Sequence, residues 1–272
     1  MVTNKERWFP LKEVTDFPVF TDVDDALKAL ALSLAHHRKK EGPVSGRKLM
    51  NFNRRRKTLA PCASNGMVDL RTGFSLLREY GIRVPDYAVV GTADKAIVKA
   101  RELGYPVAVK ISSPQVLHKT EAGGVKLNVE NDASLGRYLK QRQADAYLIQ
   151  KMIPVGIEVI VGGKRDSEFG PVILFGLGGI YVEVFRDTVL RVAPVDLTTA
   201  RQMIDSIKGS KLLKGFRGST PFDIGSLARA LVNISRLLTD HPEITNLDIN
   251  PLIVLEKGKR CFAVDVKMQI AN

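Results

Sequence analysis

The chain has 272 residues, 44% hydrophobic and 26% charged, a composition typical of a globular protein with one large or two ordinary domains. No apolar stretch approaches the roughly 20 residues of a membrane-spanning helix, and the N-terminus lacks the apolar core of a signal peptide. We therefore expect a cytoplasmic protein without membrane contact. Cys62 and Cys261 lie far apart without further ligands spaced for zinc, which excludes a disulfide framework.

A short helix is predicted near the N-terminus. Thr21 is placed as its N-cap and Asp24 at the capping-box position, and apolar residues recur at helical spacing from Leu27 to Leu34. The two histidines that follow suit the C-terminal end of the helix dipole, so we interpret them as an exposed helix end rather than a metal site. Residues 1–64 are therefore expected to form a helix and a linker.

The formal net charge of +12 is compatible with nucleic acid, an anionic membrane face or phosphorylated small molecules as partners. Residues 38–57 carry most of this excess, with many Lys and Arg against a single Glu. Gly42, Pro43 and Gly46 interrupt this segment, which is typical of a solvated linker. It shows no aromatic-interleaved or zinc-finger pattern. We do not expect nucleic-acid binding, although contact through this linker stays an alternative.

From about residue 65 the pattern alternates between helices and strands, without an internal repeat. Predicted helices run from Leu70 to Gly81 and from Thr92 to Gly104, and two more begin at Thr198 and Thr220. For the last helix, Thr220 is placed as N-cap, Pro221 at N1 and Asp223 at N3. The predicted strands are 87–90, 106–111, 125–129, 146–150, 157–161, 172–175, 181–185, 249–255 and 261–266. The fold class is α+β, with mixed α/β character.

Lys110 stands near the end of the otherwise apolar strand at 106–111. Alternation places it on the face opposite Val109 and Ile111. It is either an edge residue that aids solubility or a fixed cation facing a cleft, and a fixed ammonium is what nucleotide phosphates require. The strand alone allows both interpretations.

The loop at 112–124 follows this strand and concentrates hydroxyl groups, one histidine, one lysine and a pair of glycines. Gly123 and Gly124 allow backbone N–H groups to approach phosphate oxygens without an intervening Cβ. His118 has polar neighbours, which is not typical of a core histidine, and an imidazole can act as a nucleophile toward phosphorus or as a general acid or base. A surface histidine without a function is the alternative.

A second glycine-rich segment, at 169–180, contains Gly-Leu-Gly-Gly after a predicted strand. It is not a dinucleotide-binding fingerprint, because the third glycine is misplaced and the strand at 181–185 follows instead of a helix. We interpret it as a turn between two strands close to a ligand. Arg191, further along, is a candidate for a bidentate clamp on phosphate.

The end of the chain contains the pattern Asn246-Leu-Asp-Ile-Asn-Pro251. Asp248 and Asn250 are two positions apart on a strand, so their side chains share one face. Asp265 is predicted on the next strand, across a turn around Gly258. Two carboxylates and an amide oxygen suit a magnesium ion that phosphates already hold. Initiation of a turn is the structural alternative.

Together these segments resemble the ATP-grasp domain of the acyl-CoA synthetases that release ADP, which are relatives of the succinyl-CoA synthetase β subunit. The resemblance covers residues 70–272 almost without a gap. The matching stretches are YGIRVPDYAVVGTADKAIVKARELGYPVAVKISSPQVLHKTEAGGVKLNV, QKMIPVGIEVIVGGKRDSEFGPVILFGLGGIYVEVFRDTVLRVAPV and ITNLDINPLIV. The resemblance implies an ATP-grasp fold of two subdomains, about 65–148 and 149–272, with the nucleotide between them.

The resemblance also implies roles for individual residues. Lys110 would hold nucleotide phosphates, Gln150 and Met152 would form the hinge against adenine, Glu158 and Arg191 would lie at the phosphate end, Asp248, Asn250 and Asp265 would hold Mg²⁺, and His118 would carry a phosphoryl group. The implied reaction is reversible: acyl-CoA, ADP and phosphate give a carboxylic acid, CoA and ATP. CoA and the acyl group would bind a CoA-binding α-type ligase subunit in a hetero-oligomer.

The sequence departs from the family pattern in places. Asn246 stands where the family usually has Glu, Glu121 replaces an Asp, and Lys267 stands where an Arg is common. Residues 17–38 resemble the tail of the CoA-ligase region that precedes the ATP-grasp part in fused relatives. We therefore expect one subunit or a severed piece of a larger enzyme. The alternative to a catalytic role is a nucleotide-binding regulatory module without ligase chemistry.

Overall fold

The computed structural model describes residue 59 and residues 66–111, 124–142, 144–179, 187–215 and 220–271. The chain divides into two units between Lys57 and Thr58, and all described residues belong to the second unit. The helix predicted from Thr21, the basic segment 38–57 and the strand predicted at 181–185 lie outside the described residues. Within the described ranges, no helix has both the length and the apolar character needed to cross a membrane.

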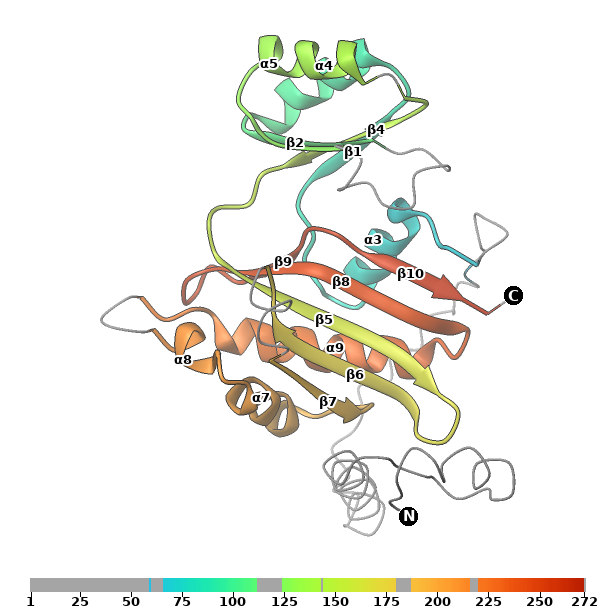
Figure 1. Ribbon diagram of the computed structural model, residues 1–272, viewed down its shortest axis with the longest axis vertical. Coiled ribbons are helices and arrows are strands. Elements are labelled where there is room, and N and C mark those ends of the chain that lie inside the picture. The colour runs from blue at the N-terminus through green and yellow to red at the C-terminus, as the bar shows by residue number, and fades with distance from the viewer. Residues whose placement is uncertain are drawn as a thin grey trace, which may run out of the picture. The chain divides into compact units, whose positions relative to one another are not determined.

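A four-stranded antiparallel sheet contains the strands that come first in the chain (Figure 1). Its strand order is β1-β4-β2-β3, with β1 (Tyr87–Val90), β2 (Val107–Ile111), β3 (Val125–Val129) and β4 (Tyr147–Lys151). Helices α4 (Ala93–Leu103) and α5 (Asp132–Gln141) lie on one face of this sheet (Figure 1). Their apolar residues form a core with those of the strands, including Ala100, Val109, Leu135 and Ile149.

Helix α4 has the predicted ends, whereas α5 was not predicted. Thr92 accepts a hydrogen bond from the N–H of Lys95 at 3.3 Å, and Gly104 ends the helix with φ of 76°. Helix α5 begins with a capping box between Asn131 and Ser134. Its only fully buried positions are Leu135 and Leu139, so its sequence lacks a strong apolar stripe.

The second sheet is antiparallel and six-stranded. Its order is β10-β8-β5-β6-β7, and β9 also pairs with β8. Its strands are β5 (Ile157–Asp166), β6 (Gly170–Leu177), β7 (Thr188–Val192), β8 (Ile244–Val254), β9 (Cys261–Ala263) and β10 (Lys267–Ile270). The helices packed with it are α3 (Leu70–Glu79), α7 (Leu197–Ser206), α8 (Ser210–Leu213) and α9 (Ile224–Asp240).

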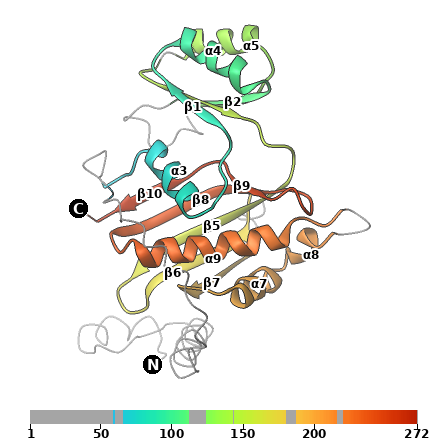
Figure 2. The same cartoon turned by 180° about the vertical axis from the view of Figure 1, so that it is seen from behind.

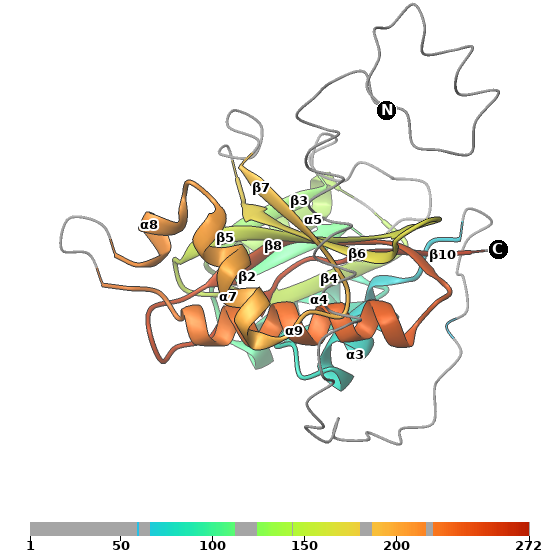
Figure 3. The same ribbon diagram turned by 90° about the horizontal axis from the view of Figure 1, so that it is seen from below.

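The core of the six-stranded sheet lies beneath α9, which runs along one face of the sheet (Figure 2). Leu227, Leu231, Ile234 and Leu238 of α9 are at most 1% exposed, because they form one apolar stripe at helical spacing. Seen from below, α7 lies on the same side of the strands as α9 (Figure 3). The opposite face of this sheet therefore carries the polar residues that alternate with the core.

Helix α3 packs with the six-stranded sheet rather than with the four-stranded one. The N–H of Val68 donates to the carbonyl of Met268 at 2.9 Å, and Phe74 and Leu77 are buried in the larger core. The first subdomain was expected at about 65–148, which includes α3. In the structure, α3 packs in the core of the six-stranded sheet and not in that of the four-stranded sheet. The reason is the backbone pairing with β10, which the local sequence does not reveal.

The last long helix begins later than predicted. Asp223, not Thr220, is the N-cap, and its side chain accepts from the N–H of Ser226 at 2.8 Å. Phe222 is already engaged in extended pairing, since its N–H donates to the carbonyl of Leu213 and it bridges to Glu256. This pairing prevents the helix from starting at Pro221.

The C-terminal strands also differ from the prediction. Strand β8 is longer than the predicted 249–255, and the segment predicted as one strand at 261–266 contains only β9. Residues 264–266 connect β9 to β10, which returns to pair with the first half of β8. The two registers continue one another, so Asp265 in this connection lies level with Asn250.

Candidate functional site

Lys110 connects the four-stranded sheet to the C-terminal strands. On β2, Val107 and Val109 are fully buried against α4 and α5, so Lys110 projects from the other face. Its Nζ donates to the carbonyl of Val264 at 2.7 Å and lies 3.3 Å from Oδ1 of Asp265. Its side chain is only 12% exposed. Of the two interpretations that the sequence left open, the structure favours the fixed cation.

The polar residues of β8 share one face, as predicted. Asn246, Asp248 and Asn250 are exposed, whereas Leu247 and Ile249 between them are buried. We call this face of the six-stranded sheet, which carries these three β8 residues together with Glu158 of β5, the polar face. Asp265 lies beside it, level with Asn250. The structure therefore brings Asp248, Asn250 and Asp265 together, at the place that Lys110 reaches.

The electrostatics of Asp248 fit a cation site. Burial raises the pKa of Asp248 above its ordinary value; Lys267 opposes this effect and Asp265 adds to it. Within the described residues, no three His, Cys, Asp or Glu side chains are grouped so that they could hold a metal ion by themselves. Two carboxylates and the amide oxygen of Asn250 are hard donors, and they fit Mg²⁺ that is also held by phosphates.

Glu158 lies further along the polar face, beneath the glycine-rich turn. It is exposed and pairs with Ile253, while its neighbour Val159 is fully buried. The N–H of Gly178 donates to the carbonyl of Glu158 at 2.7 Å. A Cβ on Gly178 would lie 2.9 Å from the carbonyl carbon of Glu158, so this position requires glycine. Gly178 is therefore packed directly against Glu158. The turn that we expected close to a ligand stays a prediction, because residues 180–186 lie outside the described residues.

Gln150 and Met152 lie where β4 leaves the four-stranded sheet. Gln150 pairs with Ala108, so it shares the face of Lys110. It is 3% exposed, and its Nε2 has no hydrogen-bond partner among the residues that the structure describes. The N–H of Met152 donates to the carbonyl of Pro106 at 3.2 Å. A buried amide donor without a partner is a suitable group for a ligand acceptor.

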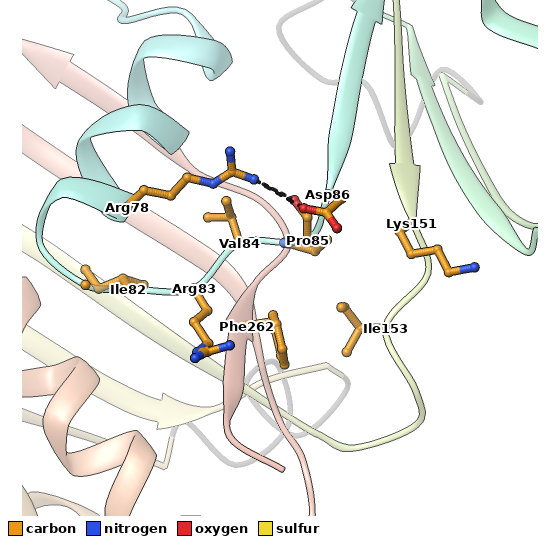
Figure 4. Close-up of a pocket in the computed structure, with 10 residues that line it drawn as sticks. Arg78, Ile82, Arg83, Val84, Pro85, Asp86, Lys151, Ile153 and Phe262 are labelled. Atoms are coloured by element: carbon orange, nitrogen blue, oxygen red, sulfur yellow. Dashed lines mark hydrogen bonds and ion pairs between the residues drawn. The ribbon is translucent and has the colours of Figure 1, made fainter. Parts of the chain in front are cut away.

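A cavity of about 530 Å³ lies next to this segment (Figure 4). Apolar side chains such as Val84, Ile153 and Phe262 line it together with cationic ones, including Lys151. The lining residues are Arg78, Gly81, Ile82, Arg83, Val84, Pro85, Asp86, Lys151, Ile153 and Phe262. Phe262 pairs with Ile253, the cross-strand partner of Glu158, so one wall of the cavity lies near Glu158. Glu158, Gln150 and Lys110 are not among the residues that line it.

Arg191 is not brought together with the other predicted phosphate-binding residues. It pairs with Ile173, which is fully buried, so it lies on the helix-covered face and not on the polar face. Its guanidinium donates to the carbonyl of Leu190 at 2.8 Å. The expectation that Arg191 lies with Glu158 at the phosphate end is therefore not supported, because strand register decides the face.

The glycine loop is described only at its end. His118 and Gly123 lie outside the described residues, so their proposed roles stay predictions. Gly124 is buried, and its carbonyl accepts a hydrogen bond from the N–H of Ile111 at 2.8 Å. It is therefore fixed next to Lys110 at the end of β2.

Sequence reasoning did not single out the residues that line the cavity, nor Lys267 as a site residue. Phe262 and Ile153 are ordinary apolar residues in the sequence, and only the folded chain brings them to the same cavity. Lys267 pairs directly with Asp248. Its spacing of two residues from Asp265 was a usable signal, because this spacing favours a shared face.

Comparison with known proteins defines the class. The family model for the ATP-grasp domain matches residues 63–270. The β subunit of acetate–CoA ligase (ADP-forming) I from Pyrococcus furiosus is 42% identical over 204 residues, which cover 71% of this chain and 87% of that subunit. The chain therefore belongs to the ATP-grasp family, and the expected fold is confirmed.

Two further relatives are informative: one is a longer protein, and the other has a solved structure. The 4-hydroxybutyrate–CoA ligase (ADP-forming) of Nitrosopumilus maritimus is 42% identical over 207 residues, but the match covers only 30% of its length against 72% of this chain. A structure of acetyl-coenzyme A synthetase 1 from Ca. Korarchaeum cryptofilum contains coenzyme A and Mg-AMPPCP, with its phosphohistidine segment pointing towards the nucleotide binding site. That chain is 37% identical with a TM-score of 0.68, and the match covers 76% of this chain and 93% of that one.

Proposed function

We propose that this chain is the ATP- and ADP-binding part of an ADP-forming acyl-CoA synthetase, an acid–thiol ligase. The relatives at 42% identity are named as ligases of this kind, and the chain matches most of a β subunit but less than a third of a longer relative. It would transfer a phosphoryl group between a histidine and Mg–nucleotide. CoA and acyl chemistry would take place on a partner.

The observation that carries this proposal is the meeting of Lys110 with Asp265. One residue comes from β2 of the four-stranded sheet and the other from the connection between β9 and β10. A fixed ammonium therefore lies beside hard oxygen donors, which is the combination that a metal–nucleotide complex requires. A lysine that served only solubility would be exposed to solvent, whereas the side chain of Lys110 is only 12% exposed.

Asp248, Asn250 and Asp265 are the residues that would hold Mg²⁺. Burial and Asp265 both disfavour the ionised form of Asp248, so a divalent cation would relieve an unfavourable arrangement. When bound, Mg²⁺ offsets negative charge on the phosphoryl group in transfer. Lys110 would give up its contact with Asp265 for a contact with a phosphate oxygen. Gly124 would hold the end of the loop beside it.

The cavity at Phe262 is the proposed site for the base. Its volume of about 530 Å³ lies in the usual range for small-molecule sites. Gln150 would offer its unpartnered Nε2 donor from the neighbouring strand end, and Met152 would follow it along the hinge. Glu158 would lie between the base and the metal on the polar face.

His118 is the proposed phosphoryl carrier. Its imidazole nitrogen would form a bond to the terminal phosphorus of ATP while the bond from that phosphorus to the bridging oxygen of ADP breaks, and the imidazole would release its N–H proton to water. The catalytic contribution of the chain would be positioning and electrostatic stabilisation. The Korarchaeum relative is described with a phosphohistidine segment that points towards its nucleotide site, which supports this role.

The partner would be a CoA-binding α-type ligase subunit. The relatives named as β subunits support a hetero-oligomer of this kind. The acyl pocket would belong to the partner, so the isolated chain would be phosphorylated without completing acyl transfer. The cytoplasmic location and the role of the segment at 38–57 stay predictions from the sequence.

Phosphorylation with labelled ATP tests the proposal. Incubation of the chain with Mg²⁺ and [γ-³²P]ATP is expected to give a phosphoprotein that is acid-labile and base-stable, as phosphohistidine is. His118→Ala should abolish the label. Lys110→Met should slow labelling at least about ten-fold, because a charge-assisted contact to phosphate contributes about 1.5–3 kcal/mol.

Lys126→Met is the matched control. Lys126 is exposed on β3 and pairs with Val109, so it lies on the helix-covered face and should not affect labelling. Unchanged labelling in His118→Ala would contradict the relay role. Nucleotide binding without any labelling would favour the regulatory alternative instead.

A further inference from the structure

Lys267 lies next to the proposed metal site. It is the first residue of β10 and the direct cross-strand partner of Asp248. Cross-strand partners have Cβ atoms about 5 Å apart and share one face, so Lys267 belongs to the polar face. Its side chain is exposed. The ammonium therefore lies beside a proposed magnesium ligand.

A lysine lies beside each of the two proposed acidic ligands. Lys110 forms an ion pair with Asp265, and Lys267 stands opposite Asp248. Lys267 itself forms no ion pair with any residue that the structure describes. If Asp248 binds the metal, the ammonium of Lys267 beside it would face the phosphate groups that the metal also binds.

The register gives the order of these groups along the polar face. Phe262, at the cavity, pairs with Ile253; Asp265 lies level with Asn250; Lys267 pairs with Asp248. From Glu158 to Gly162, the β5 partners of Ile253 and Asp248, the sheet advances roughly 14 Å at about 3.4 Å per residue. This span is comparable to an extended nucleoside triphosphate. With the base in the cavity, Lys267 lies level with Asp248, the metal ligand farthest from Phe262, on the side of the outermost phosphate.

We propose that Lys267 binds the terminal phosphoryl group of the triphosphate, the group that is transferred, while Lys110 holds the phosphates nearer the hinge. This proposal rests on the proposed function. Lys267 would act by positioning the terminal phosphoryl group and by offsetting its charge. A diphosphate lacks the terminal phosphoryl group that Lys267 would contact, so the residue would distinguish ATP from ADP.

Calorimetric titration of the full chain with Mg·AMPPCP and with Mg·ADP tests this assignment. Lys267→Met is expected to weaken Mg·AMPPCP binding about ten-fold and Mg·ADP binding less than about two-fold, since one charge-assisted contact is lost only from the triphosphate. Lys267→Arg keeps the charge and should restore most of the affinity. AMPPCP also prevents phosphoryl transfer, so the measurement reports binding alone.

Lys140→Met provides the control for loss of one positive charge, because Lys140 is exposed on α5. It should change neither affinity. Equal weakening of both nucleotides by Lys267→Met would overturn the proposal in favour of a general charge effect, and no weakening would overturn it outright. Failure of the unaltered chain to bind either nucleotide would instead refute the proposed function, together with this inference.

Discussion

At the scale of single residues, Lys110 and Asp248 show how strand position decides the use of a charge. Both stand in strands whose neighbours are apolar, and their side chains leave the buried face by alternation alone. Lys110 is paired with Asp265 and only 12% exposed, whereas the carboxyl group of Asp248 is partly buried and lies beside Lys267. Lys110 must therefore give up an ion pair to bind a ligand, whereas Asp248 has no such pair to give up among the described residues.

Asp248→Asn is expected to separate stability from binding. Burial raises the pKa of Asp248, so its ionised form is less favourable in the folded chain than in the unfolded one. This unfavourable contribution is absent below the unfolded value of 3.8 and develops as pH rises through the folded pKa. At pH 7 the metal-free variant should therefore have a higher Tm than the unaltered chain, and the difference should vanish as the pH falls below 3.8.

The same variant should lose its response to Mg–nucleotide. The unaltered chain should gain roughly 5–10 °C in Tm with Mg·ADP at about 100 times its Kd, and Asp248→Asn should gain much less. Asp145→Asn, at an exposed position before β4, removes the same charge and should behave like the unaltered chain. An Asp248→Asn variant that keeps the full Mg·ADP response would contradict the metal role of Asp248.

At the scale of elements, the start of α9 depends on one carboxylate. Oδ1 of Asp223 accepts from the N–H of Ser226, and Oδ2 accepts from the N–H groups of Gly258 and Arg260 at 3.2 and 3.1 Å. The helix is thereby tied to the turn between β8 and β9. Arg260 has a positive φ of 75°, which few side chains adopt without support. Asp223 therefore caps a helix and fixes the hairpin that leads to Asp265.

Asp223→Ala is expected to lower the free energy of unfolding by about 1–2 kcal/mol for the lost cap, and somewhat further for the turn. Thr220→Ala should change it little, because Thr220 is exposed and does not cap the helix. Urea denaturation followed by far-UV circular dichroism measures both. A larger loss of stability in Thr220→Ala than in Asp223→Ala would show that Thr220 caps the helix, as the sequence predicted.

At the scale of the whole molecule, Lys110 and Asp265 link the two sheets. Lys110 lies on a strand that packs in the core of the four-stranded sheet, and Asp265 lies next to strands that pack in the core of the six-stranded sheet. The two residues are far apart in sequence, and their side chains form an ion pair at 3.3 Å. Asp265 owes its place to the connection at 264–266, and Val266 in that connection packs against Gly73 of α3. The early helix α3 therefore helps to position a C-terminal ligand.

A double-mutant cycle on Lys110→Met and Asp265→Asn measures this link. In the ligand-free chain we expect a coupling free energy of about 0.5–3 kcal/mol, since the two side chains are in contact and partly buried. The double variant should then lose less stability than the sum of the losses in the two single variants. Additive effects in urea denaturation would show that the two residues do not interact in solution.

The sequence by itself determined the fold class and most elements of this protein. Alternation of buried and exposed positions is local, so it predicted the shared face of Asp248 and Asn250 and the projection of Lys110 from its strand. The caps at Thr92 and Gly104 are local as well. The family motifs added an expectation of a nucleotide and a metal, and the ATP-grasp assignment is confirmed.

Only the tertiary structure decided which of these side chains meet. Strand pairing joins residues that are distant in sequence, and register then fixes the face: it placed Lys110 on Asp265 and Lys267 opposite Asp248, and it turned Arg191 to the helix-covered side. Pairing at Phe222 likewise moved the helix start from Thr220 to Asp223. Local patterns carry no information about these partners, because the hydrogen bonds that select them form between separate segments.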